Sequence, residues 1–376
     1  MTTAAARCLL LGATALLAAT GRMDGEAAVR VPPARPAALA TTRFNNLEYV
    51  SVADAAVRLG LGFAVAETGR KITLDDRENK VELAAESREA AVNGLRIFLG
   101  NAVVLRNGRF YLSKIDFDRE LTPMLRPALA GPAPGRPKVI ALDPGHGGVD
   151  NGMESRPLGL KEKVLTLEVA LRAKKLLEAD GYKVVLTRND DRQLGSDKAT
   201  DFKNRGLVVN RAKADLMVSI HFNSLYPDTK TSGTEVYTFT RRGQRSDQSW
   251  GLGESDDTET EAAPVNGFDP WSSLLAHAMH REVIRHLQTF DRGHKTKHLA
   301  VLRGLTCPGV LVEAVFLSNE AEAKRAVLPE YLQRIAEAVA NGIRAYAATL
   351  DALRPTEAKP AATEAPVRAS GPTTSK

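Results

Sequence analysis

Residues 138–148 read KVIALDPGHGG, an apolar run followed by an aspartate, a proline, a histidine and three glycines. The run Val139–Leu142 is bounded by turn residues, which predicts a strand buried on both faces, as in a parallel sheet. The glycines let the backbone bend sharply and leave His146 accessible. Binding sites of open α/β sheets form at the carboxyl ends of strands, so His146 is a candidate site residue. A glycine-rich phosphate turn is the alternative, but neither its G-x-G-x-x-G spacing nor its lysine occurs here.

Strands and helices alternate from this point to the end of the folded chain. A helix is expected over 163–179, with Val164, Leu167 and Leu171 on its buried face and Gly181 ending it. Further helices are expected at 204–212, 272–287 and 332–346, and further strands at 184–186, 216–220, 234–239, 300–302 and 310–312. This alternation predicts an α/β domain over 138–350, with a mixed, largely parallel sheet flanked by helices.

Two stretches outside this pattern predict other units. Residues 43–125 contain short strands, a hairpin over 71–83 and two Asn-Gly turns, which predicts a small α+β domain. Residues 126–137 are rich in proline and glycine and read as a linker. The polar, partly acidic segment 241–269 is expected to be a surface insertion, either a solvated loop or a gate over the cleft.

The N-terminus predicts export. Arg7 precedes an apolar run from Cys8 to Ala19, which is typical of a secretory signal peptide over 1–21 and is too short to span a membrane. An ordinary unstructured tail is the alternative. Residues 22–42 read as a linker, and 351–376 as a disordered tail. The protein is therefore expected in the periplasm or cell envelope, with no membrane span.

Composition narrows the partners. The formal net charge is +6, from 51 basic and 45 acidic residues, which suits an anionic partner such as a cell-wall polymer or a membrane surface. The basic residues are scattered and aromatic residues make up only 5%, so no nucleic-acid site is expected. Of the two cysteines, Cys307 would be the single thiol after signal removal, either an apolar filler or a nucleophile.

Three further side chains are placed for chemistry. His221 follows the predicted strand 216–220, Glu162 precedes a predicted helix, and Glu313 lies inside the apolar run 310–316. A buried carboxylate is costly unless it is paired, binds a metal or carries a raised pKa. Two histidines and one carboxylate form a common ligand set for catalytic zinc, and a second carboxylate serves as general base. Spacing alone leaves this constellation open, because the four residues are scattered over more than half of the domain and no H-E-x-x-H motif occurs. Glu162 taken alone is most typical of an exposed first-turn residue.

The motifs together resemble the amidase 3 family of N-acetylmuramoyl-L-alanine amidases. The resemblance implies that His146, Glu162 and His221 bind Zn²⁺, that Glu313 is the catalytic acid and base, and that the substrate is peptidoglycan. Val315 departs from the family, which usually has glycine there. The segments that carry the resemblance are IALDPGHGG at 140–148, LKEK at 160–163, VLTRNDD at 185–191, Arg205 and Asn210, ADLMVSIHFN at 214–223, and VLVEAVFLSN at 310–319.

The N-terminal unit also resembles a known domain. Residues 43–125 are similar to the copper amine oxidase N-terminal-like, or stalk, domain of exported bacterial enzymes. They contain no histidine and no cysteine, so no copper site is expected there.

Other functional assignments stay open. Asn223 is expected to orient His221 or the substrate, or to be a turn residue, and Arg303 either binds a substrate carboxylate or is an exposed solubilising residue. No regulatory partner is identified by the sequence. Two alternative functions are a non-catalytic wall-binding protein and a metal hydrolase of another amide, such as a sugar deacetylase. The remaining histidines are expected to be surface, loop or packing residues: His277, His280, His286, His294 and His298.

Overall fold

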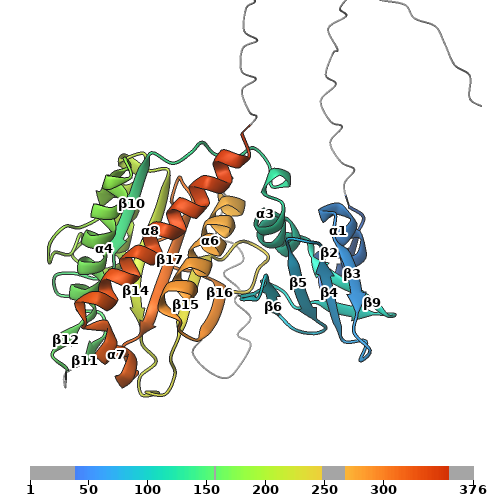
Figure 1. The fold of residues 1–376 in the computed structure, drawn as a ribbon, viewed down its shortest axis with the longest axis horizontal. Coiled ribbons are helices and arrows are strands. Elements are labelled where there is room, and N and C mark those ends of the chain that lie inside the picture. The colour runs from blue at the N-terminus through green and yellow to red at the C-terminus, as the bar shows by residue number, and fades with distance from the viewer. Residues whose placement is uncertain (1–38, 156–157, 248–266, 355–376) are drawn as a thin grey trace, which may run out of the picture. The chain divides into compact units, whose positions relative to one another are not determined.

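The computed structural model describes residues 39–155, 158–247 and 267–354. From Leu39 onward the described chain forms one compact unit (Figure 1). The predicted signal peptide, most of the first linker, residues 248–266 of the predicted insertion and the predicted tail beyond 354 lie outside the described residues. No helix in the described ranges is both long and apolar enough to cross a membrane.

The N-terminal part, residues 39–129, is built from short antiparallel strands around its own apolar core. Helix α1 (Val52–Leu59) begins where the Ser51 hydroxyl accepts the Asp54 N–H, and it ends at the left-handed Gly60. Four strands form a small antiparallel sheet in the order β1 (Thr41–Phe44), β2 (Leu47–Ser51), β9 (Arg109–Ser113) and β8 (Val104–Arg106). The other elements of this part are β3 (Gly62–Val65), β4 (Lys71–Asp75), β5 (Lys80–Ala84), β6 (Glu89–Val92), β7 (Leu95–Phe98), α2 (Lys114–Asp116), the π-helical turn η1 (Phe117–Leu121), α3 (Thr122–Leu125) and the 3₁₀ turn η2 (Pro127–Leu129).

The C-terminal part has a sheet of order β13-β10-β14-β17-β15-β16. All neighbouring pairs are parallel except β15 with β17, so the predicted mixed, largely parallel sheet is confirmed. The strands are β10 (Val139–Pro144), β13 (Lys183–Leu186), β14 (Leu216–Asn223), β15 (Thr234–Phe239), β16 (Asp291–Lys297) and β17 (Gly309–Phe316), with a separate hairpin of β11 (Glu154–Ser155) and β12 (Leu160–Lys161). The helices are α4 (Glu162–Ala179), α5 (Lys198–Arg211), α6 (Asp269–Leu287), α7 (Glu320–Ala326) and α8 (Pro329–Ala352).

Helices cover both faces of this sheet. Successive side chains of a strand point to opposite faces, so each strand contributes to the core on either side. On β10, Ile140 and Leu142 pack into the large core shared with α4, α6 and α8, which lie together over the sheet in Figure 1. Ala141 points the other way, into a smaller core that includes Val209 of α5. Strand β10 is therefore buried on both sides, as its unbroken apolar run predicts.

Two local predictions are wrong. Val164 on α4 is 57% exposed, and the face toward the sheet is instead carried by Leu165, Val169 and Ala173. Glu162, the first residue of α4, is buried, and Thr166 and Val169 lie on the same face of the helix. This face, and not the face of Val164, is therefore turned toward the sheet. Residues 300–302, expected to be a strand, form a turn, and the strand of this region is the more polar β16.

The two parts share one sheet. Strand β16 pairs with β7 through Ile97 and His294, so the sheet continues into β7-β6-β5-β4-β3. Residues 241–247, expected to begin a surface insertion, help to join the parts instead. Arg241 is 3% exposed and pairs with Glu120 of η1, and Gln244 donates to Asp116 at 3.0 Å. A polar composition suggested solvent, but these polar groups find partners in the N-terminal part.

Candidate metal centre

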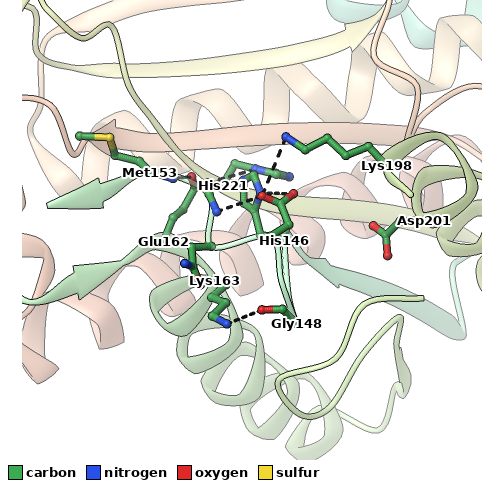
Figure 2. Close-up of polar contacts among 12 residues, drawn as sticks. His146, Gly148, Met153, Glu162, Lys163, Lys198, Asp201 and His221 are labelled. Carbon is green, nitrogen blue, oxygen red and sulfur yellow. Dashed lines mark hydrogen bonds and ion pairs between the residues drawn. The ribbon is translucent and has the colours of Figure 1, made fainter. Parts of the chain in front are cut away.

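Three side chains from three separate elements meet at the carboxyl end of the sheet (Figure 2). His146 lies in the loop after β10, Glu162 is the first residue of α4, and His221 lies in β14. Strands β10 and β14 are parallel, and Pro144 is in register with Ile220, so both histidines come just beyond the same level of the sheet. One ligand atom of each residue lies within 4.8 Å of those of the other two.

The Glu162 carboxylate sits between the two imidazoles. Its Oε1 lies 3.1 Å from His146 Nε2 and 3.1 Å from His221 Nδ1. Backbone N–H groups fix it further, with Phe222 donating to Oε1 at 3.0 Å and Met153 to Oε2 at 2.9 Å. Glu162 is only 4% exposed. It is therefore a buried, oriented carboxylate and not the solvated first-turn residue that its sequence position alone suggests.

Glycine is required at two places around these side chains. His146 itself has the left-handed φ of 63°, between Gly145 and Gly147. A Cβ added to Gly145 would lie 2.2 Å from His221 Cε1, and one added to Gly152 would lie 2.5 Å from Glu162 Oε2. Any larger residue would push a candidate ligand away, because such close contacts do not occur between real atoms.

The charges around the three side chains suit a cation. Burial alone would lower the pKa of His146, but Glu162 and Asp150 outweigh it and raise the pKa to about 9. Burial opposes ionisation of Glu162, yet its hydrogen bonds to both histidines bring its pKa well below the usual range. The carboxylate is thus held ionised with two imidazole nitrogens facing it. Two histidines and one carboxylate that lie this close together fit a divalent metal ion such as zinc, although their role as ligands stays a prediction.

An outer set of residues holds the candidate ligands, and the sequence interpretation did not single it out for this role. Asp150 Oδ2 lies 3.0 Å from His146 Nδ1, which orients the ring so that Nε2 faces Glu162. The signal for Asp150 was available, since a carboxylate four residues from a candidate histidine in a glycine-rich loop can fold back onto it.

Two buried arginines fasten the loop that carries His146. Arg205 pairs with Asp143 at 2.8 Å and with Asp201 at 2.6 Å, and it donates to the carbonyl of His146 at 2.6 Å. Arg188 donates to the carbonyls of Pro144 at 3.0 Å and Gly145 at 2.8 Å. Both guanidinium groups therefore donate to carbonyls of the loop that carries His146 and help to fix its path.

Glu313 lies on β17, in line with the metal centre across the sheet. Its Cα is the register partner of His221 on β14 and of Glu235 on β15. Its Oε2 is shielded from solvent and has no hydrogen-bond partner among the described residues. Burial, together with the charges of Glu162 and Glu235, raises the pKa of Glu313 well above its usual range. An unsatisfied carboxylate beside three candidate ligands is the arrangement that an acid–base residue needs.

Asn223 and Arg303 make contacts outside the group of three candidate ligands. Asn223 donates to Glu235 Oε2 at 2.6 Å, and in the described residues its side chain forms no hydrogen bond with His221. Arg303 is exposed in the turn after Leu302, with its guanidinium 5.7 Å from the Phe239 ring. Cys307 is buried, and burial raises its pKa to about 12, which disfavours the nucleophile interpretation.

Comparisons with known proteins point to one family. Residues 140–345 match the family of N-acetylmuramoyl-L-alanine amidases, and residues 35–119 match the copper amine oxidase N-terminal domain. The germination-specific N-acetylmuramoyl-L-alanine amidase of Bacillus subtilis is 32% identical over 218 residues, which cover 56% of this chain and 79% of that protein. The amidase AmiC of Escherichia coli is 31% identical over 250 residues, which cover 60% of this chain and 58% of the relative.

One solved structure with a similar sequence is the catalytic domain of CwlV, an N-acetylmuramoyl-L-alanine amidase from Bacillus (Paenibacillus) polymyxa. It is 29% identical, covers 56% of this chain and 97% of its own, and has a TM-score of 0.45. The amidase match takes in more than half of this chain and all four residues of the candidate site. This chain therefore belongs to the N-acetylmuramoyl-L-alanine amidase family and is an enzyme of that family.

Proposed function

We propose that the protein is a zinc-dependent peptidoglycan hydrolase that cleaves the amide between N-acetylmuramic acid and the L-alanine of the stem peptide. The observation that supports it most is the meeting of His146, Glu162 and His221 within 4.8 Å, with Glu313 in register beside His221. The substrate is that of the named relatives, and it lies outside the cytoplasm, which agrees with export to the periplasm or cell envelope.

His146, Glu162 and His221 would hold the metal ion. When bound, the ion polarises the amide carbonyl and lowers the pKa of a water molecule toward neutrality. Asp150 keeps the His146 ring in the tautomer and orientation that present Nε2 to the centre. The backbone N–H groups of Met153 and Phe222 keep Glu162 in place, so the site needs little rearrangement.

Glu313 would transfer a proton from the attacking water to the leaving nitrogen. Its carboxylate accepts a proton from the water as the oxygen attacks the amide carbon, and then transfers that proton to the L-alanine nitrogen as the C–N bond breaks. The products are a free lactyl carboxylate on the sugar and a free amine on the peptide. A raised pKa suits both halves of this cycle, because a stronger base accepts the proton more readily and still releases it to an amine.

The proposal is tested with the purified full chain and isolated cell walls. We expect wall turbidity to fall when zinc is present, activity to be lost after chelation, and zinc to restore it. Mass spectrometry of the digest should show intact glycan strands bearing lactyl carboxylates and peptides with an L-alanine N-terminus. Loss of acetyl groups with the amide intact would support a sugar deacetylase instead.

The matched variant is Glu313→Gln, which keeps the size of the side chain and removes its proton chemistry. We expect hydrolysis to fall by about 10²–10⁴-fold while zinc content stays near that of the native protein. A native protein that binds walls and zinc but releases no product, like this variant, would favour a non-catalytic wall-binding protein.

A further inference from the structure

A small cavity lies beside Glu313 and is lined by residues of β14, β15, β16 and β17 and of the adjoining loops. Its volume is about 70 Å³, which is room for two waters or one carboxylate but not for a sugar ring. Two cationic side chains, Arg292 and Lys297, face it together with Glu313. The rest of its lining is Asn223, Leu225, Glu235, Tyr237, Leu299 and Phe316.

Glu235 has all of its charge compensated by other groups. It is 1% exposed, and its Oε1 accepts from Arg292 Nε at 2.9 Å and from Lys295 Nζ at 2.9 Å. Its Oε2 accepts from Asn223 at 2.6 Å and from the Tyr237 hydroxyl at 2.7 Å. With two cations already bound to one carboxylate, Glu235 does not neutralise the remaining cation of the cavity.

That remaining cation is Lys297, the last residue of β16. Among the described residues no carboxylate forms an ion pair with it; its Nζ lies 5.7 Å from the centroid of the Tyr237 ring, and its charge acts on Glu313 from a longer distance. The side chain is half-buried, so solvent screens its charge only in part. Lys297 therefore brings an ammonium without a carboxylate partner to a cavity that Arg292 also lines, and this arrangement is suited to an anion.

The position of Glu313 decides which part of the substrate enters this cavity. Glu313 must reach the leaving nitrogen, so the peptide that this nitrogen carries lies on the Glu313 side of the scissile bond. We propose that Lys297, assisted by Arg292, binds a free carboxylate on the stem residue that follows L-alanine. In stem peptides this residue is D-glutamate joined through its side chain, which leaves its α-carboxylate free, whereas D-isoglutamine carries a neutral amide there. The inference rests on the proposed function.

The test compares two soluble muropeptides that differ only in this group, one with D-glutamate and one with D-isoglutamine after L-alanine. With zinc-loaded full chain at neutral pH, the native protein should favour the D-glutamate substrate in kcat/KM by about tenfold to a hundredfold, as a charge-assisted hydrogen bond provides. Lys297→Gln should bring this ratio close to one, and Lys297→Arg should keep most of it. Lys175→Gln, which removes an exposed lysine of α4, should leave the native ratio unchanged.

The ratio separates recognition from other roles. If Lys297→Gln lowered kcat/KM of both substrates equally, Lys297 would act through structure or through Glu313, and the subsite would be rejected. Equal cleavage of both substrates by the native protein would reject the subsite while leaving the amidase proposal intact. Cleavage of neither would overturn the proposed function and this inference with it.

Discussion

Single atoms decide how closely the candidate ligands approach one another. Gly145 and Gly152 leave space that the His221 ring and the Glu162 carboxylate fill, and Asp150 sets the direction of the His146 ring. The sequence identified His146, Glu162, His221 and Glu313 because their motifs resemble a family. Asp150, four residues after His146, gave a local signal, but the fits of Gly145 against His221 and of Gly152 against Glu162 could not be predicted, because they depend on distances across the fold.

Gly145→Ala should disrupt the metal centre with little effect elsewhere. The added Cβ would lie 2.2 Å from His221 Cε1, so the His221 ring must move. We expect zinc affinity to fall at least tenfold while the far-ultraviolet circular dichroism stays native. The control is Gly135→Ala, whose Cβ would lie 3.7 Å from Arg354 Nη2, an ordinary contact. Unchanged zinc affinity in Gly145→Ala would contradict the assignment of His221 as a ligand.

Asp150→Asn tests the outer shell. The amide keeps the size of the side chain but loses the charge that faces His146 Nδ1 at 3.0 Å. Loss of such an outer partner weakens metal binding by about 10–100-fold, which competition with a zinc chelator would measure. Asp118→Asn, at a half-buried carboxylate of the N-terminal part that pairs with Lys114, provides the comparison and should bind zinc as the native protein does.

At the scale of elements, neighbouring strands explain why residues far apart in the chain meet. Strands β14, β17 and β15 place His221, Glu313 and Glu235 side by side in register. Apolar runs predicted β10, β14 and β17 well, because a strand buried on both faces has few polar residues. Strand β16 carries Asp291, Arg292 and several other polar residues, so its hydrophobic pattern gave no comparable signal.

Residues 241–247 are a second segment whose burial its polar composition could not predict. Their polar side chains predicted a solvated loop, but Arg241 is buried between Glu120 and the first turn of α6, where it donates to the Asp269 carbonyl and the Ser273 hydroxyl at 2.8 Å. Composition cannot reveal that a partner for a buried cation lies 121 residues earlier in the chain.

Arg241→Met should therefore destabilise the protein strongly. It leaves the Glu120 carboxylate buried without its cation, which costs about 3–5 kcal/mol in the free energy of unfolding. Denaturant titration would measure this loss. In Arg241→Met/Glu120→Gln the second change removes the orphaned charge, so part of the loss should be recovered. Arg242→Met, at the exposed neighbour, should change stability by less than about 0.5 kcal/mol. A small effect of Arg241→Met would mean that this contact does not hold the two parts together.

For the molecule as a whole, buried neutral histidines link stability to pH. Burial lowers the pKa of His277 to about 3 and that of His294 to about 4, below the 6.5 of an exposed histidine. As the pH falls below 6.5, the unfolded chain takes up a proton on each ring and the folded chain does not. Their contribution is thus fully present above pH 6.5 and is lost as the pH falls toward the folded pKa values.

His277→Gln isolates one of these rings. Between pH 6 and 4 the free energy of unfolding of the native protein should fall more steeply than that of the variant, by up to about 1.4 kcal/mol per pH unit. Denaturant unfolding at several pH values, with zinc held constant, gives both slopes. Parallel slopes would show that His277 is protonated in the folded protein.

The sheet that runs from β13 through β16 and β7 to β3 has a mechanical consequence. Tension applied at the β3 edge would pass from strand to strand through the backbone hydrogen bonds of the sheet, and it would shear or peel these bonds. In the described residues the path through the sheet includes no flexible linker. A protein bound at β3 would thus be connected to the candidate metal centre through one continuous sheet, so its attachment would also fix the orientation of that centre.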